Sequence, residues 1–178
     1  KLFADIILNC VLEIQQKDKK FLATNHGFEK HKSIISNARV HQGKKYLLNL
    51  DIKDFFESIH FGRIKGYLSN DQHFLLHNKT AEIIATLATY GDRKILPQGS
   101  PLSPVLSVLI GSILDANLMK IAKKYNLSYT RYADDITFSS NKDFSKFLLK
   151  KDQNGNWELK DKFEKSINKV GFYINKEK

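Results

Sequence analysis

Apolar side chains recur three and four positions apart in three long stretches of the chain, residues 2–16, 78–90 and 104–125. This spacing is typical of helices that bury one face. A fourth stretch, residues 157–170, predicts an amphipathic helix near the end of the sequence. Cys10 lies on the apolar stripe of the first stretch, so we expect it to be a buried thiol.

Shorter apolar runs separate these helical stretches. Residues 46–52 predict a buried strand, and residues 127–139 predict two strands joined by a turn at Ala133 and Asp134. Residues 171–175 resemble the start of another strand. Strands alternating with helices in this way indicate an α+β domain whose sheet is covered by helices on one face.

Prolines and small polar residues mark where some of these elements begin. The segment 95–104 carries three prolines and a glycine, which predict a loop. Ser103 suits the N-cap position of the helix that follows, and Pro104 suits its first position. Asp54 is a candidate cap for a short helix that begins at Phe55.

Composition and charge narrow the class of protein. A chain of 178 residues suffices for one domain, or two small subdomains, with a real core. The formal net charge of +10 favours a polyanionic partner, nucleic acid or an anionic membrane, although a solvated lysine-rich surface has the same charge. The longest apolar segment, residues 104–119, is interrupted by polar residues, so we expect no membrane span and no membrane partner.

Three aspartates stand at the ends of apolar runs, where an unpaired carboxylate is costly because it loses hydration. They are Asp51, Asp134 and Asp135. Adjacent aspartates in a straight strand face opposite sides, so only a tight turn lets both reach one metal pair. Three converging carboxylates suit Mg²⁺, with the backbone carbonyl of Ile52 as a further ligand, and predict two-metal phosphoryl transfer. The alternative is that these aspartates cap turns and pair with surface cations.

Four motifs then resemble, in order, the successive palm motifs of reverse transcriptases. They are DIKDFF at 51–56, LPQGSPLSP at 96–104, YADD at 132–135 and GFYINKEK at 171–178. The resemblance covers residues 25–178. Within that family the chain is most similar to bacterial retron reverse transcriptases, through HGF at 26–28 and NARVH at 37–41.

The resemblance implies a role for each matching position. Asp51, Asp134 and Asp135 would be catalytic and would hold two Mg²⁺ ions, for which Mn²⁺ can substitute, with Ile52 as an extra ligand. The positions expected to bind the incoming dNTP are Asp54, Phe55, Phe56, Gln98 and Lys178. The positions expected along template and primer are Gly99, Ser100, Pro101 and Tyr132, with Asn37 and His41 close to RNA.

Some of these positions also have a simpler explanation. Phe56 would lie beneath the sugar and exclude NTPs, but it can equally be a core aromatic. Gln98 and Gly99 can form an ordinary turn. His41 is a residue type that more often satisfies a fold than contacts RNA. Val108 departs from the family, which commonly has asparagine there.

The implied architecture is a polymerase palm, an antiparallel sheet backed by helices, with part of the fingers and without a thumb. Residues 1–45 would be partial fingers, residues 46–178 would be palm, and further fingers elements would be interleaved around residues 60–95. The chain begins at Lys1 without a methionine and ends in a lysine-rich tail, so we expect it to be an excerpt.

The implied function is that of an RNA-directed DNA polymerase in the bacterial cytoplasm, acting in antiviral defence. Its partners would be an RNA template, the RNA–DNA hybrid, a structured noncoding RNA, dNTPs and an effector or toxin protein. Two alternatives stay open: a group II intron-type or other stand-alone defence reverse transcriptase, and a non-catalytic RNA-binding scaffold. The intact set of three aspartates argues against the scaffold.

Overall fold

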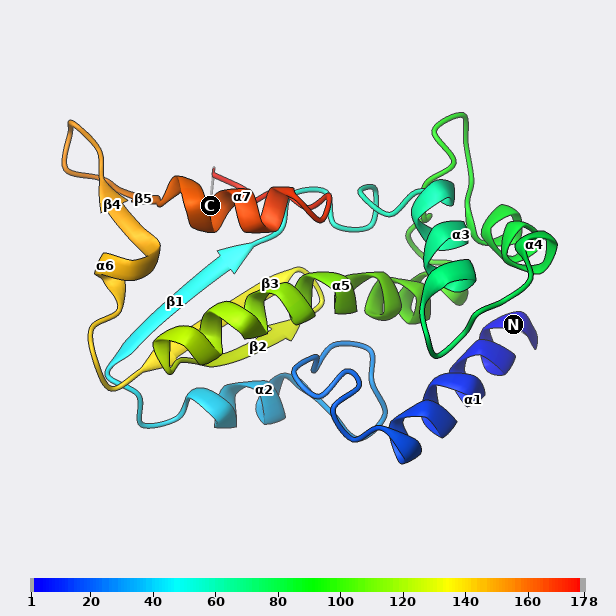
Figure 1. Cartoon of the computed structure of the whole chain (residues 1–178), viewed down its shortest axis with the longest axis horizontal. Coiled ribbons are helices and arrows are strands. Elements are labelled where there is room, and N and C mark those ends of the chain that lie inside the picture. The colour runs from blue at the N-terminus through cyan, green and yellow to red at the C-terminus, as the bar shows by residue number, and fades with distance from the viewer. Residues whose placement is uncertain (1, 177–178) are drawn as a thin grey trace. The chain divides into compact units, whose positions relative to one another are not determined.

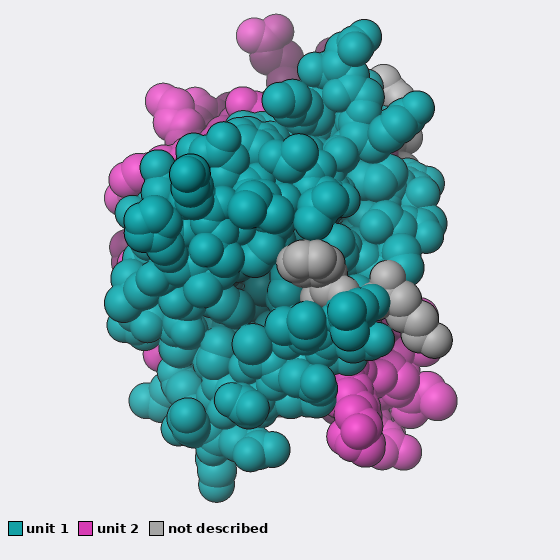
Figure 2. Space-filling view, turned by 90° about the vertical axis from the view of Figure 1, so that its right-hand side faces the viewer, with its two compact units in different colours: residues 1–23, 54–112 teal, residues 24–53, 113–178 magenta. Residues whose placement is uncertain are grey.

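The structure, a computed structural model, describes residues 2–176 (Figure 1). The chain divides into two compact units, which Figure 2 colours separately. The first comprises Lys1–Ala23 and Asp54–Ser112, and the second comprises Thr24–Lys53 and Ile113–Lys178. Both units are therefore discontinuous in sequence.

Helices and strands alternate along the described residues, as expected for an α+β chain. The helices are α1 (Leu2–Lys17), α2 (Ile34–His41), α3 (Phe61–Asn70), α4 (Asn78–Ala88), α5 (Leu102–Tyr125), α6 (Ser145–Leu148) and α7 (Asp161–Asn168). The strands are β1 (Tyr46–Asp51), β2 (Ser128–Tyr132), β3 (Asp135–Ser140), β4 (Leu149–Lys151) and β5 (Trp157–Leu159).

The second unit is built on an antiparallel sheet with the strand order β1-β3-β2. Strands β2 and β3 form a hairpin in which Tyr132 lies opposite Asp135, so Ala133 and Asp134 make a two-residue turn. This hairpin confirms the two strands and the turn predicted for residues 127–139. Strand β1 pairs with the edge of β3 that does not face β2, so β3 is the central strand.

One face of this sheet packs on helices α5 and α7. Tyr129 and Phe138 lie opposite each other on this face, with ring centroids 5.0 Å apart. Phe138 also contacts Phe163 of α7 edge-on at 5.8 Å. The two helices are joined because the Asn117 side-chain amide donates to the Ser166 carbonyl at 2.7 Å. These aromatic contacts are part of the core of the unit, which also includes buried aliphatic side chains such as Ile136 and Leu114.

The opposite face of the sheet is partly covered by helix α2, which lies beside β2 in Figure 1. His41 is buried at the end of α2, and its two ring nitrogens lie 2.7 Å from the hydroxyls of Ser139 and Thr130. Burial, with a smaller contribution from the nearby ammonium of Lys44, lowers the pKa of His41 below its ordinary value. A neutral His41 thus fastens α2 to the sheet.

The prediction of a buried strand at residues 46–52 was wrong about burial. Strand β1 forms, but 43% of Tyr46 and 54% of Leu47 remain exposed. The reason is its position at the edge of the sheet, where only one neighbouring strand covers it. A short apolar run predicts a strand, but it does not show whether one or both faces of that strand are buried.

Three predicted boundaries also differ. Residues 157–159 are not helical, because β5 pairs with β4 before α7 begins at Asp161. Asp54 caps no helix: its carbonyl accepts from the Ser58 amide at 2.8 Å, and the segment is a turn. Ser103 lies inside α5, where its hydroxyl donates to the Pro97 carbonyl at 2.6 Å. Local hydrogen bonds of small polar groups compete here with helix capping.

In the first unit, the described side chains of helix α1 include a narrow buried stripe, formed by Ala4, Ile7 and Val11. Cys10 lies beside this stripe and is exposed, so the expected buried thiol is not found. The apolar positions of α1 cover a wider arc than the surface it packs on, as the 50% exposure of Ile6 also shows.

By length and composition alone, helix α5 could cross a membrane. The sequence had predicted no membrane span, because polar residues interrupt this segment. However, 56% of its apolar window is buried within the structure. A mostly buried helix of this kind is typical of a protein core, because the apolar side chains already have protein neighbours.

Candidate active site

Two of the three predicted metal-binding aspartates face each other in the sheet of the second unit. Asp51 ends β1 and Asp135 begins β3, and the two are direct partners in the antiparallel register. Side chains of such partners project from the same face, with Cβ atoms about 5 Å apart. The Ile52 amide continues the pairing by donating to the Asp134 carbonyl at 3.0 Å. The strand ends therefore bring both acidic motifs together.

The donor set at this position suits a divalent cation. Like charges directly opposite each other destabilise a sheet, and a cation between two carboxylates removes that repulsion. Asn175 holds one of them: its side-chain amide donates to Asp51 Oδ2 at 3.0 Å, and its backbone amide donates to the Asp51 carbonyl at 2.8 Å. Among residues 2–176, however, no three His, Cys, Asp or Glu side chains are grouped closely enough to form a metal site.

The turn that carries Asp134 is held in a strained conformation. Ala133 has a φ of 54°, in the left-handed region that glycine usually occupies in two-residue hairpin turns. Gly27 packs directly against this turn, and a Cβ added to it would lie 2.4 Å from the Ala133 nitrogen. The segment stays there because the His26 amide donates to the Arg131 carbonyl at 2.7 Å and the Arg131 amide donates to the Thr24 carbonyl at 3.0 Å.

Replacing Gly27 by alanine is expected to destabilise the fold by about 1–3 kcal/mol, because an added methyl group must displace backbone atoms of the turn. Chemical denaturation of the variant and the parent measures this difference. Gly66→Ala, inside α3 with open space around the glycine, is the matched control and should raise stability by about 0.5–1 kcal/mol. Equal stability of Gly27→Ala and the parent would contradict the close packing.

A buried ion pair supports the same turn from the helix side of the sheet. The Arg131 guanidinium is fully buried and donates to both carboxylate oxygens of Asp115, at 2.8 and 2.7 Å. Its third nitrogen donates to the Ala133 carbonyl at 2.9 Å, and the Tyr129 hydroxyl donates to Asp115 at 2.6 Å. One guanidinium thus connects helix α5 to the turn.

The titration of this cluster follows from its surroundings. Burial alone would lower the pKa of Arg131, but Asp115 raises it above its ordinary value. Burial and the Asp115 carboxylate together raise the pKa of Tyr129. The sequence interpretation took Asp115 only as an interruption of an apolar segment. A lone acid in such a segment signals a buried cationic partner, because an uncompensated carboxylate there is costly.

A groove of about 560 Å³ lies in the second unit between α2 and β1. Asn49 and Thr137 line it and face each other two residues before Asp51 and two residues after Asp135, so they share a face of the sheet with the two carboxylates. Asn37 also lines it, and its buried Oδ1 has no hydrogen-bond partner among the described residues. The acidic pair therefore shares its sheet face with a groove that is mainly apolar and carries a few polar side chains.

In the first unit, the residues predicted to bind a triphosphate lie in the turn that follows β1. Phe55 is buried, and Phe56 contacts it edge-on at 5.6 Å and is half-buried. Ser58 closes the turn by donating to the Phe55 carbonyl at 2.6 Å, and Arg63 donates to the Ser58 carbonyl at 2.9 Å. The turn is therefore fixed from α3, and Phe56 belongs partly to its packing.

The predicted template loop precedes α5 in the same unit. Gln98, Gly99 and Pro101 are exposed, and Gly99 has a φ of 91°, which side-chain-bearing residues rarely adopt. The Ser100 hydroxyl accepts from the Leu102 amide, the first amide of α5, at 3.3 Å. The loop presents its backbone to solvent at the helix start.

The remaining predicted site residues are Tyr132, Ile52, His41 and Lys178. Tyr132 is half-buried opposite Asp135. Ile52 is buried and forms an isolated β-bridge with Ile174. The strand expected at residues 171–175 is reduced to this single bridge. Both ring nitrogens of His41 bond within the fold. Lys178 lies outside the described residues.

Residues 4–178 match the protein family described as reverse transcriptase (RNA-dependent DNA polymerase). Among curated proteins, the chain is 41% identical over 115 residues to the retron Ec86 reverse transcriptase of Escherichia coli, a match that covers 64% of this chain and 34% of that protein. It is 36% identical over 130 residues to the retron Mx162 reverse transcriptase of Myxococcus xanthus, covering 64% and 26%. It is 33% identical over 169 residues to the retron Ec73 reverse transcriptase of Escherichia coli, covering 84% and 48%.

The chain thus spans between about a quarter and a half of the length of these curated relatives. The family match, over residues 4–178, includes both acidic motifs and the loop before α5. The expected likeness to retron reverse transcriptases is confirmed.

Proposed function

Because the chain belongs to the reverse transcriptase (RNA-dependent DNA polymerase) family, we propose that it carries the nucleotidyl-transfer site of a retron-like polymerase that copies RNA into DNA. The observation that supports this most strongly is the direct opposition of Asp51 and Asp135 at the adjoining ends of β1 and β3. Two carboxylates on one sheet face repel each other, and a divalent cation bound between them would relieve that repulsion.

In the proposed mechanism Asp51, Asp134 and Asp135 would hold the divalent ions, and the Ile52 carbonyl would be a further oxygen ligand. Mg²⁺, or Mn²⁺ in its place, supplies positive charge at the reacting phosphate when bound. Asn175 orients the Asp51 carboxylate through its amide hydrogen bond. The protein's contribution is therefore mainly positioning and charge neutralisation, as phosphoryl transfer requires.

The incoming dNTP would be bound by residues of the first unit. The turn at Asp54 and Phe55 offers backbone amides to the triphosphate, and Phe56 selects the deoxyribose because its ring excludes a 2′-hydroxyl. Gln98 would lie along the nascent base pair. Lys178, which belongs to the second unit and lies outside the described residues, is proposed as a ligand of the leaving pyrophosphate. The fixed turn conformation supports this arrangement, since preorganised groups need not reorder during the reaction.

Template and primer would follow the sheet face that bears the acidic pair. The groove lined by Asn37, Asn49 and Thr137 supports this path, because it provides polar side chains on the same face as Asp51. Tyr132 and the backbone of residues 99–101 would contact the paired strands, and His41 would contribute by fixing α2. The formal net charge of +10 favours such a polyanionic ligand.

The biological setting is proposed from the same relationship. The curated relatives are retron reverse transcriptases of Escherichia coli and Myxococcus xanthus, so we place the protein in a bacterial cytoplasm with a structured noncoding RNA and an effector or toxin protein in antiviral defence. Residues 1–45 and the elements around residues 60–95 would belong to the fingers, and the rest of residues 46–178 to the palm.

Primer extension by the full-length protein on an RNA template tests the proposed activity. We expect incorporation of dNTPs that requires Mg²⁺ or Mn²⁺ and stops with EDTA, because the opposed carboxylates need a cation to bind a triphosphate. NTPs should be poor substrates. RNA binding without incorporation under any divalent cation would favour a non-catalytic scaffold instead.

The retron assignment has a separate test. A group II intron-type or other stand-alone defence enzyme would use a different RNA partner from a retron. Sequencing the nucleic acid that copurifies with the protein should reveal a branched RNA–DNA molecule. Only linear cDNA or an intron RNA in the purified protein would contradict the retron assignment while leaving the polymerase activity intact.

A further inference from the structure

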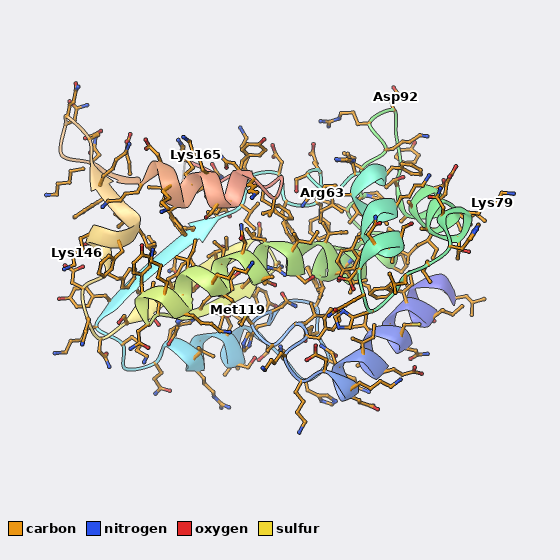
Figure 3. All side chains as sticks on the ribbon, in the orientation of Figure 1. Arg63, Lys79, Asp92, Met119, Lys146 and Lys165 are labelled. Carbon is orange, nitrogen blue, oxygen red and sulfur yellow. The ribbon has the colours of Figure 1, made fainter. Side chains whose placement is uncertain are left out.

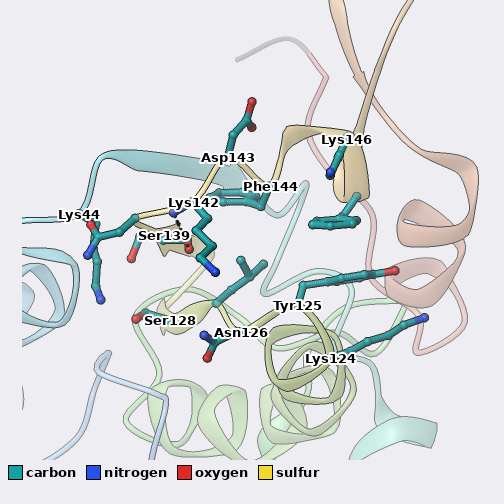
Figure 4. Close-up of a pocket in the computed structure, with 14 residues that line it drawn as sticks. Lys44, Lys124, Tyr125, Asn126, Ser128, Ser139, Lys142, Asp143, Phe144 and Lys146 are labelled. Carbon is teal, nitrogen blue, oxygen red and sulfur yellow. Dashed lines mark hydrogen bonds between the residues drawn. The ribbon is translucent and has the colours of Figure 1, made fainter.

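A second concave surface lies in the second unit, at the end of the sheet away from the acidic pair. It is a pocket of about 700 Å³ bordered by the α2–β1 connection, the end of α5 and the segment after β3 (Figure 4). Strand β3 runs from Asp135 to Ser140, which lines the pocket. Five residue steps of about 3.4 Å place the two sites about 17 Å apart along the strand.

The pocket concentrates positive charge. Its lysines are Lys44, Lys124, Lys142 and Lys146. All four are exposed, and within residues 2–176 none of them forms an ion pair. The pocket's one acid, Asp143, accepts a hydrogen bond from the Ser145 amide at 2.8 Å. Four ammonium groups against one carboxylate make a surface suited to several phosphates.

An aromatic wall adjoins these lysines. Tyr125 and Phe147 stack with ring centroids 4.5 Å apart and an interplanar angle of 13°, and 38% of Phe147 is exposed. Lys124 and Lys146 each hold their ammonium group about 5 Å from one of these rings. Ser128 and Asn126 line the pocket as hydrogen-bond donors and acceptors. Nucleic acids bind surfaces of this kind, because their bases contact the aromatic rings while their phosphates contact the adjacent cations.

We propose that this pocket binds a single-stranded segment of RNA, with its phosphates on Lys44, Lys142 and Lys146 and a base against the Tyr125–Phe147 wall. This inference rests on the proposed function, because it assigns the pocket to the RNA that the enzyme copies or carries. Because the pocket lies about 17 Å from the acidic pair, it cannot take a direct part in nucleotidyl transfer. The pocket instead anchors RNA beyond the reacting end.

The chemistry of the pocket favours RNA over other polyanions. An acidic peptide would need only the cations and would leave the aromatic wall without a matching group. A membrane surface is broad, whereas these lysines surround a concavity. An unpaired nucleotide offers a phosphate for the ammonium groups, a base to lie against the edges of the stacked Tyr125 and Phe147 rings, and polar groups for Ser128 and Asn126, so it uses each feature of the pocket.

The test compares two triple variants of the full-length protein with equal changes in charge. One replaces Lys44, Lys142 and Lys146 by glutamine. The control replaces Lys162, Lys165 and Lys169, exposed lysines in and just after α7 (Lys165 is labelled in Figure 3), by glutamine. Fluorescence anisotropy measures the affinity for a labelled 12-nucleotide single-stranded RNA in EDTA, at several salt concentrations.

We expect the pocket variant to bind this RNA roughly 100-fold more weakly at 0.1 M salt, with a log–log salt slope shallower by about 2, because three phosphate contacts are lost. The control variant should change affinity less than about threefold. Equal losses in the two variants would overturn the proposal, and so would loss of binding to anionic lipid vesicles or to an acidic peptide with RNA binding unchanged.

Extension of a short preformed RNA–DNA hybrid separates this inference from the proposed function. The pocket variant should extend a hybrid with a single-nucleotide template overhang as well as the parent does, since one unpaired template nucleotide cannot span the roughly 17 Å between the acidic pair and the pocket. If the parent itself does not extend the hybrid, the proposed function fails. The comparison of RNA affinities still decides the role of the pocket.

Discussion

Replacing Asp51 by asparagine is expected to lower the rate of dNTP incorporation about 1,000-fold, the equivalent of about 4 kcal/mol in transition-state stabilisation. The reason is that the amide keeps the shape of the carboxylate and can accept the hydrogen bond from Asn175, yet it carries no charge to hold a cation opposite Asp135. Single-turnover primer extension with saturating dNTP measures the change directly.

The same substitution should act on stability in the opposite direction. Without divalent cations, Asp51→Asn is expected to stabilise the fold by about 0.2–1 kcal/mol, since like charges no longer face each other across β1 and β3. Asp92→Asn, at the exposed turn between α4 and α5 (Figure 3), is the control and should change neither property. An Asp51→Asn enzyme with parental activity would refute the assignment of the acidic pair.

The second large effect concerns the ion pair behind the acidic turn. Asp115→Asn leaves the Arg131 guanidinium buried without its counter-charge and should destabilise the fold by about 3–5 kcal/mol. Tyr129→Phe, which removes one hydrogen bond to the same carboxylate, should cost only about 0.5–1.5 kcal/mol. Denaturant titrations of both variants test this ranking.

A double variant separates positioning from stability. Asp115→Leu combined with Arg131→Met replaces the ion pair by apolar groups and should regain much of the lost stability. It still lacks the donor to the Ala133 carbonyl, so we expect primer extension to stay at least tenfold below the parent at temperatures where both are folded. Full recovery of activity in the double variant would show that Arg131 serves stability alone.

The sequence predicted the elements that depend on local pattern. Helical periodicity located α1, α4 and most of α5, and the run around Ala133 and Asp134 predicted the hairpin. These features follow from the spacing of apolar residues and from turn chemistry, both of which are set by neighbours in the chain.

Features that depend on distant partners were missed. The exposure of β1 follows from its place at the sheet edge, which its own residues do not specify. Strand β5 forms because β4 lies beside it, although the helical period of residues 157–170 favoured a longer helix. Asp115 and Gly27 gain their importance only when the hairpin packs against them.

The candidate site was predicted in the same partial way. Charge placed at the ends of apolar runs led to Asp51 and Asp135, whose pairing in the sheet is the simplest outcome of an antiparallel arrangement. The support from Arg131 and Asn175 has no signal in spacing, because each contact joins residues through the fold.

Locating bound manganese by anomalous diffraction tests the central claim most directly. Crystals of the full-length protein soaked in Mn²⁺ should show an anomalous peak between the carboxylates of Asp51 and Asp135, with Asp134 and the Ile52 carbonyl as neighbouring oxygen donors. Manganese bound only elsewhere on the protein, with the space between these two carboxylates empty, would contradict the account.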